Sequence, residues 1–486
     1  MNINKLISFI LASLMLVSCG ESFLERTNPA ALSYDKFYRT EADFQAALNG
    51  CYYRLRSPVM QLMCINETIT DNTYVNHYDP VSDNYNFFLT TVSANSSTLS
   101  GLWQNGYYTI AAANLVITRI KDSQVPEATR KVFVSEAKFI RAWTYFYMVR
   151  VFGGIPLYTE EPSNLSMVYD VGRSTVEETY NFIISDLVDA QNIDNERNTQ
   201  QKASAKNKVS SAAVKALLGK VYLYKGDYAK AASTLADVVS NGGYRLLDNL
   251  ADIYNADTPL NDEVIFSINF ERVSGQNSPL TGPTLPKFSR GILPNQTASD
   301  NGSGFYNIED VFFRTFSDDD KRKSFIDSAD IIMGSDVIKY YYSKKYCDLG
   351  TTAAGLSASK FIVLRYADVL LMSADAANQS GNTAGAYQYV NAVRKRAGLG
   401  DLPAGLSKEQ MNEALAQERQ KEFLCEADRW FDLSYRGFAY LKKTLNDFYP
   451  GSHAPNAVIK DHMVLFPIPS SQVDLKPDKL PQNQGY

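Results

Sequence analysis

The sequence predicts a mainly α-helical protein in which pairs of helices form a scaffold and an irregular, loop-rich part carries short strands. Three observations predict this class. Apolar residues recur at three- and four-residue steps in several segments, which is the period of a buried helix. A helix-pair pattern at 218–238 returns in looser form at 374–393. By contrast, residues 66–100 and 250–355 have no helical period and are interrupted by polar residues, glycine and proline.

The first strongly periodic helix is predicted within residues 136–150, where the apolar positions are Phe139, Ile140, Trp143, Phe146, Tyr147 and Val149. Gly153 and Gly154, followed by a proline, are expected to end it. A second helix is predicted to begin at Ser174, because Ser174 and Glu177 have the spacing of a capping box. Its apolar stripe consists of Val176, Tyr180, Ile183, Ile184 and Leu187.

The next segment predicts a tetratricopeptide-like helix pair, with the pattern Leu218, Gly219, Tyr222, Gly226, Tyr228, Ala231, Leu235 and Val238. Gly219 and Ala231 are small, so the two helices can approach closely, and residues 225–227 form the turn. The looser copy consists of Ala374, Ala377, Gly381, Ala386, Val390 and Val393, for which an unrelated helical hairpin is the alternative. Because such pairs bury their faces only against neighbours, they are expected to stack, together with the helix at 137–149.

The N-terminal segment predicts export. Lys5 precedes an apolar stretch at 6–17, which as a helix would be roughly 18 Å long, too short for the ~30 Å hydrocarbon core. The segment is therefore predicted to be a signal peptide, residues 1–18. Its ending, Leu-Val-Ser-Cys, resembles a bacterial lipobox, which implies cleavage before Cys19 and a covalent lipid on that cysteine. An ordinary secretory signal with an incidental cysteine is the alternative.

Composition excludes several functions. The net charge of −5 and the pI near 5.5 argue against nucleic-acid binding, which needs clustered Lys and Arg. The histidines and cysteines have no metal-binding spacing, so no cofactor is expected besides the lipid. Spacing assigns no disulfide among the four other cysteines, and buried thiols are the simpler expectation for Cys51, Cys64, Cys347 and Cys425.

No motif predicts catalysis. The sequence has neither a G-x-S-x-G elbow nor a glycine-rich phosphate loop. The acidic run 318–320, followed by three basic residues, predicts a solvated charged turn rather than a cation site. Acidic and basic residues between 418 and 432 are predicted to form packed ion pairs: Glu418, Arg419, Glu422, Asp428, Arg429 and Asp432. We therefore expect a binding protein, with a surface glycoside hydrolase as the remaining alternative.

Seven segments, in order along the whole mature chain, resemble the SusD/RagB family of surface nutrient-binding lipoproteins of Bacteroidetes. They are Cys19 with Phe23-Leu24-Glu25, Trp103-x-x-x-Tyr107, residues 139–157, residues 364–372, residues 391–398, residues 418–433, and Phe466-Pro467-Ile468-Pro469 with the end at 482–486. Three positions depart from the family pattern: Ala427 replaces a frequent glycine, Ser434-Tyr435 replaces a more usual Arg-Trp neighbourhood, and Gln484 stands where proline is common.

The resemblance implies a right-handed scaffold of helical pairs decorated by a less regular, ligand-facing half. It also implies a lipid-anchored, surface-exposed protein of the outer membrane and a partner, a SusC-like TonB-dependent transporter. The implied cargo is an oligosaccharide, with peptides as the alternative. We divide the chain into the signal peptide 1–18, a region 19–250 with the helical repeats, and a region 251–486 with a loop-rich insertion at 251–355, expected to form one globular unit.

Candidate ligand-binding residues follow from the chemistry of sugar recognition, in which aromatic faces stack on sugar rings and polar side chains bind hydroxyls. All three tryptophans, Trp103, Trp143 and Trp430, fall in helical scaffold segments, so loop tyrosines, phenylalanines and histidines are expected to stack. The candidates are Tyr74, Asn76, His77, Tyr78, Asp79, Tyr85, Phe305, Tyr306 and Tyr341. For each aromatic candidate, packing inside the protein is the alternative.

Overall fold

The computed structural model describes residues 37–75, 83–193, 208–258, 261–287, 292–293, 302–333, 336–351 and 355–486. Helices dominate, as predicted. The helices of the first half are α3 (Glu41–Arg54), α4 (Val59–Met63), α5 (Asp83–Phe88), α6 (Ser97–Arg119), α7 (Glu127–Phe152), α8 (Leu165–Asp170), α9 (Val176–Ala190), α11 (Ser211–Lys225) and α12 (Tyr228–Asn241), with a π-helical turn η2 (Cys64–Thr68). Those of the second half are α13 (Ala251–Tyr254), α14 (Thr281–Thr284), α15 (Asp310–Phe313), α16 (Tyr366–Gln379), α17 (Thr383–Arg396), α18 (Lys408–Glu422), α19 (Arg429–Tyr435), α20 (Phe438–Phe448) and α21 (Ser470–Val473), with the 3-10 turns η4 (Lys321–Phe325) and η5 (Lys344–Tyr346).

The capping box of α9 lies one residue later than predicted. Thr175, not Ser174, is the N-cap: its hydroxyl accepts from the Glu178 N–H at 3.1 Å, and the Glu178 carboxylate accepts from the Thr175 N–H at 2.8 Å. Both pairs of residues fit the capping-box spacing. The backbone N–H of Ser174 donates to the carbonyl oxygen of Ile155, which keeps Ser174 outside the helix.

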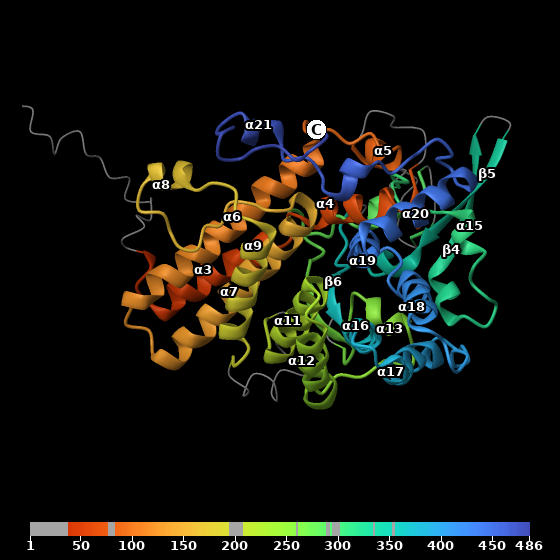
Figure 1. Ribbon diagram of the computed structural model, residues 1–486, viewed down its shortest axis with the longest axis horizontal. Helices are drawn as coiled ribbons and strands as arrows, with labels where there is room; N and C mark the ends of the chain where they lie inside the picture. Colours follow the sequence, from red (N-terminus) through yellow and green to blue (C-terminus); the bar gives the residue numbers. More distant parts are fainter. Residues whose placement is uncertain are drawn as a thin grey trace, which may run out of the picture.

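Both predicted helix pairs are present. In the first, a Cβ on Gly219 of α11 would come within 2.6 Å of the Leu235 side chain of α12, so the close approach of these helices requires glycine. Gly226 turns the chain with φ of 83°, a left-handed conformation, and the Asp227 side chain caps α12. In the second pair, α16 and α17 form a small core of their own together with α18. The pairs lie in a row, with α12 packed against α16 (Figure 1).

The irregular half carries two small antiparallel sheets. The larger has the strand order β1-β3-β5-β4, with β1 (Thr73–Tyr74), β3 (Asn307–Ile308), β4 (Ile326–Met333) and β5 (Asp336–Ser343). The smaller pairs β2 (Val264–Ile268) with β6 (Phe361–Arg365). In Figure 1 the β4–β5 hairpin lies at the opposite end of the molecule from α3, α6 and α7. One hydrophobic core extends from Phe44 to Leu480 and joins the halves, for example through Phe139 of α7 edge-on to Phe266 of β2.

A buried group of charged side chains, which we call the ion cluster, holds the irregular half against the helices. At its centre Arg365, at the end of β6, contacts Glu263 at 3.0 Å, Glu422 at 2.5 Å and Glu426 at 2.9 Å. The other members are Arg396 of α17, Arg322 of η4, Lys345 of η5, Glu418 of α18 and Asp320. As predicted, Glu418 and Glu422 form buried ion pairs with basic side chains.

Asp320 corrects the prediction for the acidic run 318–320. Asp318 and Asp319 are exposed, but Asp320 is only 1% exposed and accepts from the guanidinium of Arg322 at 2.9 Å. Arg322 in turn contacts Glu418 and Glu422. Sequence alone could not separate these residues, because the carboxylates that draw Arg322 into the interior lie about a hundred positions away.

The departure at Ala427 has a structural consequence. Ala427 has φ of 58°, in the left-handed region that favours glycine, and its N–H donates to the buried carboxylate of Glu67 at 2.9 Å. The left-handed conformation brings the Cβ of any L-residue other than glycine too close to the following carbonyl oxygen. The frequent glycine at this family position is therefore the residue that the backbone favours.

Replacing Ala427 with Gly is expected to raise the free energy of unfolding by about 0.5–1 kcal/mol. Relief of the left-handed strain is worth about 1–2 kcal/mol, and the greater freedom of glycine in the unfolded chain offsets part of it. Chemical denaturation measures the change. The matched control is Ala236→Gly, at an exposed position inside α12, which is expected to lose about 1 kcal/mol. A loss of stability in both variants would contradict the account.

Candidate functional site

Five of the predicted functional residues lie outside the described residues. They are the anchor Cys19 and the loop candidates Asn76, His77, Tyr78 and Asp79. Tyr74, Tyr85, Phe305, Tyr306 and Tyr341 are described. Tyr74, Phe305, Tyr306 and Tyr341 lie in or beside the four-stranded sheet, and Tyr85 lies in helix α5.

Tyr74 is buried in a stack of aromatic rings on one face of this sheet. It is 4% exposed, and the imidazole of His453 covers it with ring centroids 3.7 Å apart and planes 9° from parallel. Tyr340 of β5 lies beside Tyr74, with the centroids of the two rings 6.2 Å apart. Tyr74 therefore packs within the protein, the alternative that the sequence left open, and His453 presents the exposed edge of the stack.

A second aromatic pair lies on the opposite face, because neighbouring residues on a strand point to opposite sides. Tyr341, next to Tyr340 on β5, stacks on Phe313 of α15 with centroids 4.2 Å apart. Both rings are half-buried, and the ammonium of Lys323 lies 5.5 Å from the Phe313 ring centroid. We call Phe313 and Tyr341 the sheet-site aromatics, since they combine partial exposure with stacked, fixed rings.

The remaining described candidates differ in exposure. Tyr306 has no exposed surface, so its ring packs in the core, and burial raises the pKa of its hydroxyl well above the ordinary value. Phe305 and Tyr85 are half-buried at the core's edge, and Tyr85 lies 6.1 Å from Phe88. Phe313 and His453 were not among the predicted candidates. The adjacent aromatic residues Phe312 and Phe313 are the local signal for Phe313, and His453 has no such signal.

His453 forms an ion pair with Glu309. Its Nδ1 lies 2.7 Å from the Glu309 carboxylate, which is 1% exposed, whereas the His453 side chain is 38% exposed. Partial burial lowers the pKa of His453, but the hydrogen bond and charge of Glu309, with a contribution from Asp310, outweigh it and raise the pKa above its ordinary value. The ion pair therefore stabilises the fold below the unfolded-state pKa near 6.5, and this contribution is lost as the pH rises through the folded-state pKa.

Replacing Glu309 with Gln is expected to lower the pKa of the His453 imidazole, because the amide keeps the shape but carries no charge. A proton NMR titration of the imidazole resonances measures the change. His462, which packs edge-on to Tyr486, is the internal control, and its resonances should not respond to the substitution. An unchanged pKa for His453 would show that Glu309 does not hold its proton.

A cavity of about 350 Å³ lies between α6, the segment 156–168 and the C-terminal residues near Lys476. Its walls include Trp103, Tyr107, Tyr108 and Tyr158. Trp103 is buried, as its place in a scaffold helix predicted, but it still lines this cavity beside Tyr108, which is 51% exposed. The four-residue spacing from Trp103 to Tyr107, and from Gln104 to Tyr108, places each pair on one side of α6.

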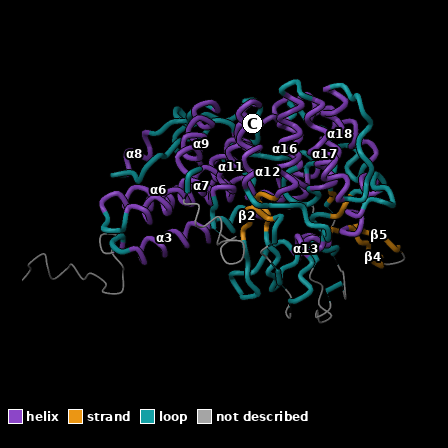
Figure 2. Tube along the Cα trace, turned by 90° about the horizontal axis from the view of Figure 1, so that it is seen from below, coloured by secondary structure: helices purple, strands orange, loops and turns teal. Residues whose placement is uncertain are grey.

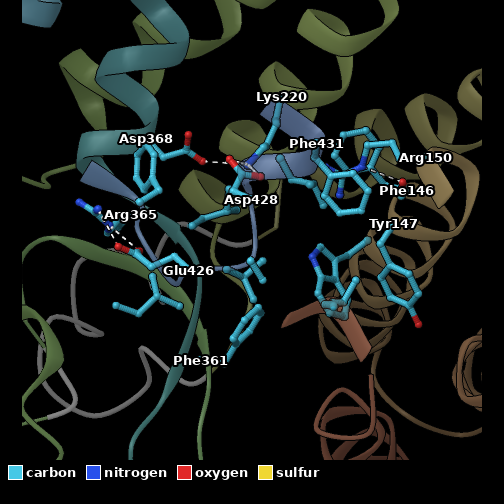
Figure 3. A pocket seen from close by; sticks show the side chains of 18 residues that line it. Phe146, Tyr147, Arg150, Lys220, Phe361, Arg365, Asp368, Glu426, Asp428 and Phe431 are labelled. Atoms are coloured by element: carbon cyan, nitrogen blue, oxygen red, sulfur yellow. Dashed lines mark hydrogen bonds and ion pairs between the residues drawn. The ribbon is translucent and has the colours of Figure 1, made fainter. Parts of the chain in front are cut away.

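A pocket of about 60 Å³ next to the ion cluster has a structural role (Figure 3). Lys220 contacts Asp368 and Asp428, each at 3.1 Å, and the Arg150 guanidinium lies between the rings of Phe146 and Phe431 at 3.9 and 3.8 Å. Burial raises the pKa of Asp428, but Lys220 and Arg419 outweigh it and lower the pKa overall. The charges are mutually paired, and the volume is below the roughly 300 Å³ of ordinary ligand pockets.

The other residues of this region also form ion pairs, as predicted. Arg419 contacts Asp368, Asp428 and Asp432, and Arg429 contacts Asp71. Within the described part of the chain, no cluster of His, Cys, Asp and Glu has the geometry of a metal site. The four described cysteines are free thiols, and no described helix is both long and apolar enough to cross a membrane.

Two family models match the chain. The model described as the SusD family matches residues 327–486, and the model described as starch-binding associating with outer membrane matches residues 22–223. The chain belongs to the SusD/RagB family. This confirms the resemblance seen in the sequence motifs.

Whole-chain comparisons agree. The SusD-like protein P25 of Formosa agariphila is 26% identical, and the alignment covers all of both chains. Surface glycan-binding protein A from Bacteroides uniformis has a TM-score of 0.77 at 23% identity, covering 91% of this chain and 99% of its own. A laminarin binding SusD-like protein has a TM-score of 0.76 at 23% identity, covering 92% and 100%. These structural likenesses confirm the predicted fold of the SusD/RagB chain.

Proposed function

We propose that the protein is a non-catalytic, surface-exposed lipoprotein of the outer membrane that binds glycans and delivers them to a SusC-like TonB-dependent transporter. The observation that carries the proposal is membership of a family whose matching model is described as starch-binding and outer-membrane-associated. Two structural neighbours are described as a laminarin binding protein and a surface glycan-binding protein.

The sheet-site aromatics supply the surface for this role. A sugar ring has apolar C–H faces that pack on an aromatic ring and hydroxyls that need hydrogen-bond partners. Tyr341 and Phe313 are fixed by stacking on each other, so little side-chain entropy is lost when a sugar packs against them.

The non-catalytic role is supported by three buried glutamates whose pKa values are shifted but which are not accessible to a substrate. Glycoside hydrolysis needs two carboxyl groups about 5–10 Å apart across an accessible cleft, one of them a proton donor. Burial raises the pKa of Glu67 to about 8, but this side chain is fully buried and accepts from Asn72 and the backbone of Ala427. Glu422 and Glu426 are held in the ion cluster with lowered pKa values, because their basic neighbours outweigh burial.

The anchor completes the proposal. A lipid on Cys19 would add about 0.8 kcal/mol of membrane affinity for each buried CH₂, so two or three acyl chains hold a soluble body at the surface. The lipid would thereby hold the folded part at the same membrane as the transporter.

Tyr341→Ala is expected to weaken glycan binding by between a few-fold and about tenfold, the effect of losing roughly 0.5–1.5 kcal/mol of stacking. Calorimetric titration of the protein starting after Cys19, against a panel of polysaccharides including laminarin and against peptide mixtures, measures it. Tyr169→Ala is the matched control, because Tyr169 is 55% exposed in α8, far from the sheet. Saturable binding to peptides alone would overturn the glycan assignment in favour of peptide uptake.

A further inference from the structure

A second cavity of about 400 Å³ lies between the end of α3 and the loop that follows β2. Figure 2 shows α3 and β2 on the side of the molecule opposite α16 and α17. The cavity is lined by charged, amide and aromatic side chains, among them Arg56, Lys208, Tyr53, Phe270, Asn49 and Gln276. Its volume is in the range of ordinary small-ligand sites.

Arg56 is the most unusual of these residues. Its guanidinium has five N–H donors, of which Nε donates to the carbonyl oxygen of Asn269 at 2.8 Å. Nη1 is buried without a hydrogen-bond partner, and no carboxylate of the described chain lies within ion-pair distance of Arg56. By contrast, Arg365 and Arg419, which are more deeply buried, each contact three carboxylates.

Two aromatic rings hold this cation in place. The Arg56 guanidinium lies 5.3 Å from the ring centroid of Tyr53 and 5.5 Å from that of Phe270, within the range of cation–π attraction. The Tyr53 ring is 54% exposed beside it. The rings orient the guanidinium without neutralising it, so its positive charge remains available to a ligand.

Lys208 adds a second positive charge to the cavity. Its ammonium donates to the neutral amide oxygen of Gln45 at 3.3 Å, and within the described residues it too has no carboxylate partner. Glu271 also lines the cavity and is exposed, so the lining carries two positive charges and one negative charge. The cavity therefore has a net positive charge, which an anionic group of a ligand would neutralise.

We propose that this cavity binds the anionic group, carboxylate or sulfate, of an acidic saccharide. Arg56 provides charge-assisted hydrogen bonds, Lys208 adds attraction, and the exposed face of Tyr53 packs against the sugar ring. The saccharide part of this inference rests on the proposed glycan-binding function, whereas the anion part rests on the cavity alone. The site is separate from the sheet-site aromatics, so the two can fail independently.

The test compares three monosaccharide probes: glucuronate, glucose 6-sulfate and neutral glucose. Ligand-observed NMR titration of the protein starting after Cys19 measures their dissociation constants. At least one of the two anions is expected to bind about tenfold or more tightly than glucose, and more weakly as NaCl is raised, because salt screens the attraction. The tighter of the two identifies the anionic group.

Variants assign the binding to this cavity. Arg56→Gln is expected to remove the preference for the anion and Lys208→Gln to weaken it, with unchanged melting temperatures as evidence of folding. Arg54→Gln is the matched control, because Arg54 is an exposed cation two residues away at the end of α3. Equal binding of glucose, no binding of either anion, or equal effects of Arg56→Gln and Arg54→Gln would overturn the proposal. Tyr341→Ala should leave the anion binding intact, so a failure of glycan binding at the sheet is distinguishable from a failure here.

Discussion

The ion cluster around Arg365 is the interaction on which the position of the irregular half depends. Arg365 ends β6 and meets carboxylates that come from the start of β2 and the end of α18. Arg322 precedes β4 and Lys345 follows β5, so both enter the cluster from the open end of the β4–β5 hairpin. Removing one partner of such a buried pair costs about 3–5 kcal/mol, because an uncompensated charge stays in the interior. The cluster therefore fixes where the hairpin, and with it Tyr341, lies relative to the helices.

A second set of contacts fixes the segment before Tyr74. Arg429 at the start of α19 contacts Asp71, and the hydroxyl of Tyr449 donates to the carbonyl oxygen of Ile69 at 2.6 Å. Both partners are more than three hundred residues away in sequence. The segment 69–71 has no helical period in its sequence, and it is held in place by partners near the C-terminus rather than by neighbours in the chain.

The sequence predicted the scaffold because its signals are local. The helix period, the small residue Gly219 at the close approach of two helices and the turn at Gly226 each involve residues within about one helix pair, and all are present in the structure. The capping box was placed one residue early because two overlapping pairs fit the same spacing. The sites were less predictable. Tyr74 and Tyr306 have the composition of loop residues, yet long-range packing buries them, and His453 reaches Tyr74 from the far end of the chain. The charge of Arg56 is available to a ligand because no carboxylate of the described residues lies within ion-pair distance of it. The sequence around Arg56 does not indicate this.

The central claim is that the chain captures cargo at the outer membrane and passes it to a transporter. Its most direct test is to solubilise the outer membrane of cells producing the tagged protein, purify it in mild detergent, and identify the proteins that remain bound. The account predicts that a TonB-dependent barrel of the SusC type co-purifies with the wild-type chain, and that Cys19→Ala moves the protein out of the membrane fraction. Recovery of the wild-type protein from that membrane with no barrel attached would contradict it.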